Sequence, residues 1–149
     1  MPVMFLDFDG VLHPEFCHES RHFECVHHLA SACGGRDDLD IVISSTWRHT
    51  MGLAALKSRF PEALARRIIA VTPPYAELQD LPHKVMPFER EAECLGWMRA
   101  NRPGHTTWIA VDDRPWLYRP FCPELFLVRG KTGLDAATGG QLLKRLERL

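Results

Sequence analysis

Residues 4–14 read MFLDFDGVLHP and place two aspartates at the end of a run of large apolar residues. Such a short, continuous apolar run is typical of a β-strand that is covered on both faces of a sheet. Residues i and i+2 of a strand point to one side, so Asp7 and Asp9 are predicted to point together while Phe8 packs away from them. Gly10 permits the sharp turn that leaves the sheet.

Four further apolar runs resemble the strand predicted over residues 2–8, and they lie at 40–45, 67–72, 106–113 and 124–130. Helical patterns separate them, at 22–35, 52–60, 87–104 and 138–149. Buried strands that alternate with helices predict an α/β fold, with a parallel sheet of about five strands and helices on both faces. The proline-rich stretch 72–87 is predicted to be an ordered loop near the functional site.

The composition is that of one globular domain over residues 1–149, with 46% apolar and 25% charged residues. A net charge of −1 provides no general attraction for nucleic acid or for an anionic membrane. The N-terminus lacks the basic region of a signal peptide, and no apolar stretch approaches the roughly 18 residues that cross a bilayer. The five cysteines form no C-x-x-C pair, which favours reduced thiols. We therefore expect a cytoplasmic protein.

Polar side chains end three of the predicted strands. The first ends in Asp7 and Asp9, the second in Ser44 and Ser45, and the fourth in Asp112-Asp113. Ligands of parallel sheets bind beyond the carboxyl ends of the strands, where these groups would meet. Crowded carboxylates repel each other unless a cation neutralises them, and Mg²⁺ binds a few carboxylate oxygens together with a substrate phosphate. The pattern indicates a site for phosphate chemistry, with a carboxylate as the nucleophile.

The D-x-D-G-V-L motif, the strand ending in serine and the strand ending in Asp-Asp together resemble the haloacid dehalogenase-like (HAD) phosphohydrolases. The resemblance covers roughly residues 3–130. It implies a HAD-like, Rossmann-like three-layer sandwich and a Mg²⁺-dependent phosphatase. In this family Asp7 would be the nucleophile, and Asp9 would protonate the leaving oxygen and then activate water. That role requires an environment that raises the pKa of Asp9.

The same resemblance implies the remaining ligands. Ser44 would donate a hydrogen bond to a phosphoryl oxygen, and the backbone N–H of Ser45 would assist it. Mg²⁺ would be held by side chains at two strand ends and by one main-chain carbonyl, with one aspartate acting through water: Asp7, the carbonyl of Asp9, Asp112 and Asp113.

The family also places a basic residue near the nucleophile, and two residues qualify here. Lys84 lies in the proline-rich loop, and Arg90 lies in the first turns of the predicted helix. The segment REAECLGWM, residues 90–98, resembles a subgroup of small HAD domains in multidomain RNA-repair proteins, which favours Arg90. SSTWRH, residues 44–49, resembles the same subgroup. Trp47 is predicted to pack in the core, with a wall for a base or sugar as the alternative, and Arg48 is a candidate ligand for a second substrate phosphate.

The chain leaves little room for the cap domain of many HAD relatives, because residues 10–39 hold one predicted helix and the second connection is shorter. An uncapped site suits a macromolecular end or a partner protein that closes it, and residues 13–22 are predicted to form a small flap. His18, His22 and Cys25 have a spacing that can bind zinc, although ordinary helix or flap residues explain them as well.

The sequence thus predicts a phosphohydrolase that cleaves a phosphomonoester through an aspartyl-phosphate. Its expected substrate is a phosphorylated small molecule, such as a nucleotide, or a nucleic-acid end, and no membrane is involved. Two alternatives belong to other classes. One is a catalytically inactive HAD-like module that binds partners. The other is a receiver-like phosphoacceptor domain, in which Lys131 would be the lysine after the last strand.

Overall fold

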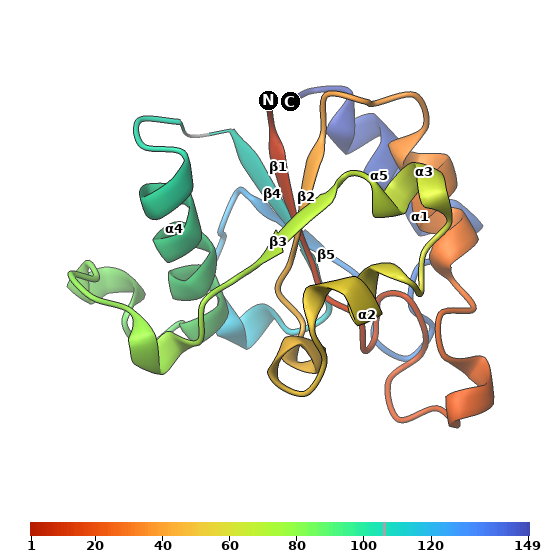
Figure 1. The fold of residues 1–149 in the computed structure, drawn as a ribbon, viewed down its shortest axis with the longest axis horizontal. Coiled ribbons are helices and arrows are strands. Elements are labelled where there is room, and N and C mark those ends of the chain that lie inside the picture. Colours follow the sequence, from red (N-terminus) through yellow and green to blue (C-terminus); the bar gives the residue numbers. More distant parts are fainter. Residues whose placement is uncertain (106) are drawn as a thin grey trace.

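A computed structural model describes residues 1–105 and 107–149, and its centre is a five-stranded parallel sheet (Figure 1). The strands are β1 (Val3–Leu6), β2 (Asp40–Ile43), β3 (Ile68–Val71), β4 (Trp108–Asp112) and β5 (Leu125–Leu127). Their order across the sheet is β3-β2-β1-β4-β5. The five strands and their parallel arrangement are as predicted. Thr106, which the prediction for the fourth strand includes, lies outside the described residues.

Helices cover both faces of the sheet and make a three-layer sandwich. In Figure 1, α4 lies on one side of the sheet, and α1, α3 and α5 lie on the other. The helices are α1 (Val26–Cys33), α2 (Leu53–Lys57), α3 (Glu62–Ala65), α4 (Glu89–Asn101) and α5 (Ala136–Leu146). Short 3₁₀ turns join them, at η1 (Glu19–Arg21), η2 (Thr46–His49), η3 (Tyr75–Glu77), η4 (His83–Val85) and η5 (Pro115–Leu117).

Two apolar layers follow from the alternation of side chains along the strands. Met4 and Leu6 of β1 pack into the core on the side of α1 and α5. Phe5 points the other way, where the indole rings of Trp97 and Trp108 pack edge-on against it at 5.9 and 5.6 Å. All four residues of β1 are fully buried, so the continuous apolar run is explained by cover on both faces.

The helices predicted over 87–104 and 138–149 are α4 and α5, with ends shifted by two or three residues, and the other two predicted helices differ more. The helix predicted over 22–35 begins at Val26, because Phe23 has a φ of +66°, which a helix does not accommodate. The helix predicted over 52–60 is only α2, and a further short helix, α3, begins directly after Pro61. Proline fixes φ and has no N–H, so it separates the two. We had not predicted α3.

The topology bears on two expectations. Receiver domains have the strand order 2-1-3-4-5, in which the first strand does not neighbour the fourth. Here β1 lies between β2 and β4, and Lys131 is exposed, so the receiver-like alternative is wrong. Within the described ranges no segment forms a separate cap domain, as predicted, and none of the described helices has the length and apolarity to span a bilayer.

Candidate active site

Three carboxylates meet where β1 and β4 end. Leu6 pairs with Val111, so the next residues along the two strands, Asp7 and Asp112, lie side by side. Asp113 completes the group, and one oxygen from each side chain lies within 4.8 Å of the others. Asp9 does not contribute a side-chain oxygen to this group.

Burial and the neighbouring negative charge raise the pKa values of two aspartates in this group. Burial raises the pKa of Asp7 well above its usual range, and the neighbouring charge of Asp112 adds to the shift. Burial and the charge of Asp112 also raise the pKa of Asp113, to about 6. Each ionised carboxylate is therefore destabilised by its surroundings, and a cation would relieve this.

Arg90 supplies one positive charge to the cluster. Its Nη1 lies 2.9 Å from Oδ2 of Asp112 and 3.3 Å from Oδ1 of Asp7. Its side chain is only 6% exposed, because α4 begins at Glu89 and directs Arg90 inward beneath the strand ends. Lys84, the other candidate, is exposed in η4. The structure therefore brings Arg90 to the carboxylates.

Asp112 is held by further donors. Its Oδ1 accepts a hydrogen bond from the backbone N–H of Arg114 at 3.1 Å, and its Oδ2 accepts one from the hydroxyl of Tyr118 at 3.1 Å. The sequence analysis did not identify Tyr118. An aromatic residue six positions after Asp112 is only a weak sign of a hydrogen-bond donor to that aspartate, because core packing explains an aromatic residue there equally well.

Two buried oxygens at the site lack a hydrogen-bond partner within the described residues. One is Oγ of Ser44, whose residue is 1% exposed directly after β2, and the other is Oδ1 of Asp113. Buried polar groups are usually paired, so each is free to bind a ligand. A hydroxyl can donate to a phosphoryl oxygen, and carboxylate oxygens are the ligands that small divalent cations prefer. Ser45, by contrast, uses its hydroxyl to accept a hydrogen bond from the backbone N–H of Trp47.

A buried ion-pair chain connects Arg90 to the turn after β2. Glu93, one helical turn from Arg90, has Oε1 at 3.5 Å from Nε of Arg90 and Oε2 at 2.5 Å from Nη2 of Arg48. Arg48 also donates to the carbonyls of Ser44 and Ser45, at 2.9 Å each. This chain fixes Arg90 and the segment that presents the Ser44 hydroxyl.

These contacts overturn the prediction that Arg48 binds a second phosphate. Its side chain is 3% exposed, and Nε donates to the carbonyl of Thr72 at 3.0 Å. All three guanidinium nitrogens are thus bound inside the protein. Arg48 lies beside the site, as the sequence indicated. However, its guanidinium donates to backbone carbonyls and to Glu93 and so is not available to bind a ligand.

Asp9 lies apart from the carboxylate cluster, and its electrostatics differ from the prediction. The imidazole of His13 donates to Oδ1 of Asp9 at 2.7 Å, and the indole N–H of Trp47 donates to Oδ2 at 3.0 Å. The hydrogen bond from His13 lowers the pKa of Asp9, whereas the sequence analysis expected it to be raised. The expectation came from the catalytic role that the family resemblance implies. In the structure Asp9 is 41% exposed and each of its carboxylate oxygens accepts a hydrogen bond, which favours the ionised form.

The three residues considered for zinc do not come together. His18 caps η1 by accepting from the backbone N–H of Ser20, and Cys25 Sγ contacts the carbonyl of Thr132. His22 stacks on His13, with ring centroids 4.5 Å apart. Across residues 1–105 and 107–149, the three aspartates are the group close enough to hold a metal ion.

Gly10 packs closely against the side chain of Asp113 in the carboxylate cluster. Gly10 has a φ of +78°, and a Cβ placed on it would lie 2.1 Å from Oδ2 of Asp113. We expect Gly10→Ala to lower the free energy of unfolding by about 1–3 kcal/mol, as strained backbone positions do. The control is Gly35→Ala, because nothing lies within 4 Å of a Cβ at that position. Urea denaturation measures both, and equal effects of the two substitutions would contradict the close packing of Gly10.

The comparison with known proteins agrees with this geometry. Residues 3–138 match the family described as the HAD domain in Swiss Army Knife RNA repair proteins. The chain belongs to this family. No curated protein and no solved structure matches the chain. The match spans all five strands and the described site of this HAD domain, and it agrees with the resemblance seen in the sequence.

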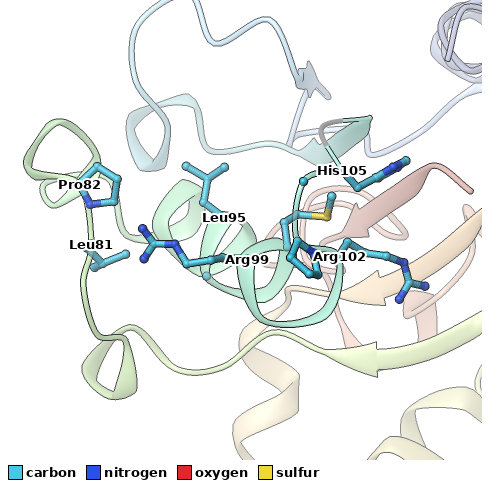
Figure 2. Close-up of a pocket in the computed structure, with 10 residues that line it drawn as sticks. Leu81, Pro82, Leu95, Arg99, Arg102 and His105 are labelled. Atoms are coloured by element: carbon cyan, nitrogen blue, oxygen red, sulfur yellow. The ribbon is translucent and has the colours of Figure 1, made fainter.

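A further cavity of the HAD domain, with a mainly apolar lining, lies elsewhere. It has a volume of about 350 Å³ and runs along α4 toward the residues that precede β4, at the amino ends of the strands (Figure 2). Arg99 and Arg102 line it, but Arg99 donates to the carbonyl of Asp80 and Arg102 pairs with Asp40 at 2.7 Å. The lining is mainly apolar, and it includes His105, whose buried Nε2 has no hydrogen-bond partner among the described residues. The grouped carboxylates lie at the carboxyl ends of the strands instead.

Proposed function

We propose that this HAD domain is a Mg²⁺-dependent phosphohydrolase that cleaves a phosphomonoester through an aspartyl-phosphate on Asp7. The observation that carries the proposal is the buried group of Asp7, Asp112 and Asp113, with Arg90 bound to two of them. A group of three carboxylates around one arginine is poorly suited to a purely structural role, since burial, together with the charge of Asp112, raises the pKa values of Asp7 and Asp113.

The cluster fits Mg²⁺ by its donors and its small size. The side chains of Asp7 and Asp112, the Asp9 carbonyl and Asp113 acting through water would hold the ion. When bound, Mg²⁺ supplies positive charge that offsets the repulsion between the nucleophile and the phosphate. Arg90 adds to that charge, and the free hydroxyl of Ser44 would donate to a phosphoryl oxygen.

The reaction divides into two displacements at phosphorus. First, an oxygen of Asp7 forms a bond to phosphorus while the bond to the leaving oxygen breaks, and Asp9 gives that oxygen its proton. Next, Asp9 takes a proton from a water molecule, whose oxygen attacks phosphorus and releases Asp7. The pKa of Asp9 is lowered in the protein without substrate. For Asp9 to act as an acid, the negative charge of a bound phosphoryl group must raise this pKa, because a nearby like charge disfavours the ionised carboxylate.

The substrate class we favour is a nucleic-acid end or a nucleotide. The family description, which refers to RNA repair proteins, supports this choice. A hollow of about 250 Å³ opens beside Asp9, and it is lined by Phe16, which is 94% exposed, and by Arg114. An exposed aromatic ring near a cation suits stacking of a base. Since the site is uncapped, a partner protein that covers it is a further part of this proposal.

Release of p-nitrophenol from p-nitrophenyl phosphate, with and without Mg²⁺, tests the proposed activity. We expect turnover that depends on Mg²⁺ and stops on chelation. Nucleotides and oligonucleotides with 3′- or 5′-phosphates then identify the substrate class. Folded protein that releases no p-nitrophenol and no phosphate from any of these, in the presence of Mg²⁺, would favour the inactive binding module instead.

Binding of Mg²⁺ should stabilise the protein in a pH-dependent way. The pKa of Asp113 is raised to about 6, so without metal this residue stabilises the folded state at low pH, and the contribution is lost as pH rises from about 4 through 6. Mg²⁺ needs ionised ligands, so it should raise the melting temperature more at about pH 8 than at about pH 5. Asp112→Asn is the control, and Mg²⁺ should raise the melting temperature of this variant only slightly at either pH. An equal response at the two pH values would contradict a carboxylate site.

A further inference from the structure

The side chain of Asp9 is held at both carboxylate oxygens by aromatic N–H donors. Nε2 of His13 lies 2.7 Å from Oδ1, and Nε1 of Trp47 lies 3.0 Å from Oδ2. An indole nitrogen can only donate, so the direction of the Trp47 bond is fixed. His13 is four residues beyond Asp9, whereas Trp47 comes from η2 after the next strand, so the two donors approach from separate segments.

The direction of the His13 bond is fixed by a third group. Nδ1 of His13 accepts the backbone N–H of Phe23 at 3.2 Å, so the hydrogen of the neutral ring lies on Nε2 and points at Asp9. The imidazole is 1% exposed and stacked on the ring of His22. This environment keeps one tautomer and one ring orientation.

Trp47 is partly buried, and aromatic rings surround its indole. Its ring packs edge-on against Phe8 and Phe23, with centroids 5.7 and 5.3 Å apart, and against His22 at 5.2 Å. Both donors are therefore fixed by packing before any substrate arrives. The sequence analysis favoured core packing for Trp47, and the structure shows that the packed ring also presents its N–H to the site.

We propose that His13 and Trp47 are positioning residues, whose N–H groups hold the carboxyl group of Asp9 in the orientation that protonates the leaving oxygen. Each carboxylate oxygen keeps a second lone pair for the transferred proton. The free side of Asp9 opens on the 250 Å³ hollow, where a leaving group has room. This inference rests on the proposed phosphatase activity, and neither donor needs to touch the substrate.

The dependence of rate on the leaving group tests this role. Trp47→Phe keeps an aromatic ring and removes the donor, and His13→Leu removes the donor at the other oxygen while keeping an apolar side chain. The probes are para-substituted phenyl phosphates, from p-nitrophenyl phosphate, which needs little protonation, to phenyl phosphate, which needs more. General acid catalysis contributes about 10²–10⁴-fold, so we expect kcat/KM for phenyl phosphate to fall at least about tenfold more than for p-nitrophenyl phosphate.

Three controls separate positioning from loss of structure. His13→Gln keeps a donor near the position of Nε2 and should recover most of the rate with phenyl phosphate. Trp97→Phe removes a more deeply buried indole that packs on the other face of the sheet, against Phe5, and should leave the ratio of the two rates unchanged. In an Asp9→Asn background, Trp47→Phe should have no further effect on that ratio, since both act through the same group.

The possible outcomes distinguish this inference from the proposed function. Variants that lose equal rate with every aryl phosphate would overturn the positioning role while leaving the phosphatase activity in place. The same conclusion follows if Trp47→Phe still alters the leaving-group dependence in the Asp9→Asn background. If folded wild-type protein hydrolyses none of the aryl phosphates, the proposed function fails and the positioning role fails with it.

Discussion

Asp7→Asn should lose turnover of p-nitrophenyl phosphate by about a thousandfold or more, because an amide cannot form the bond to phosphorus that the carboxylate forms. The loss should not come from unfolding. Burial and Asp112 raise the pKa of Asp7, so its charge destabilises the metal-free protein, and the neutral amide removes that charge. We therefore expect the variant to be at least as stable as wild type near neutral pH without Mg²⁺.

Steady-state kinetics and urea denaturation measure the two effects on the same preparation. The matched control is Asp37→Asn, because the side chain of Asp37 is 80% exposed and the residue precedes the amino end of β2, at the edge of the sheet opposite the carboxylate cluster. It should leave both activity and stability within error of wild type. An Asp7→Asn protein that keeps a tenth or more of wild-type activity would exclude Asp7 as nucleophile, on the magnitudes expected for such groups.

Replacing Arg90 should reduce activity and stability together. Arg90→Met leaves the carboxylates of Asp7, Asp112 and Glu93 without their shared counter-charge in a buried site. Removing one partner of a buried ion pair is expected to lower the free energy of unfolding by about 3–5 kcal/mol. Mg²⁺ should recover part of that stability, because it supplies charge to two of the same carboxylates, but not the lost rate.

The control for Arg90 is an exposed ion pair. Arg66 lies 3.8 Å from Asp37 with a side chain that is 67% exposed, and Arg66→Met should change stability by less than about 1 kcal/mol. Arg90→Lys provides a second comparison, since lysine keeps the positive charge but lacks the planar guanidinium, whose several N–H groups reach two aspartates and Glu93 at once. Wild-type stability in Arg90→Met would contradict the network described for the site.

The framework of the fold was predictable because it depends on local patterns. Continuous apolar runs identified the five strands, and the parallel sheet brought Asp7 and Asp112 to one edge. A helix-period pattern with acidic residues first placed Arg90 near the start of α4. What local patterns could not predict was α3, which is a single turn after Pro61 with too little periodicity to recognise.

The parts of the site that were missed depend on contacts between distant residues. Trp47 donates to Asp9 across 38 positions, and Arg48 pairs with Glu93 across 45. No spacing rule relates such positions, so the sequence did not show that Arg48 is paired inside the protein, nor that both carboxylate oxygens of Asp9 accept hydrogen bonds. His13 lies only four residues from Asp9, but a histidine in a predicted flap is not a signal for a partner unless the turn that joins them is known.

The most direct test of the account is to trap the covalent intermediate. In Asp9→Asn, p-nitrophenyl phosphate needs little help with its leaving group, whereas the water that releases Asp7 lacks its base, so the phosphorylated enzyme should accumulate. Acid quenching after mixing with Mg²⁺ and this substrate, followed by peptide mass spectrometry, locates the phosphoryl group. We expect it on Asp7, and no phosphopeptide in the double variant Asp7→Asn/Asp9→Asn. A phosphoryl group on another residue, or turnover with none on the protein, would contradict the aspartyl-phosphate mechanism.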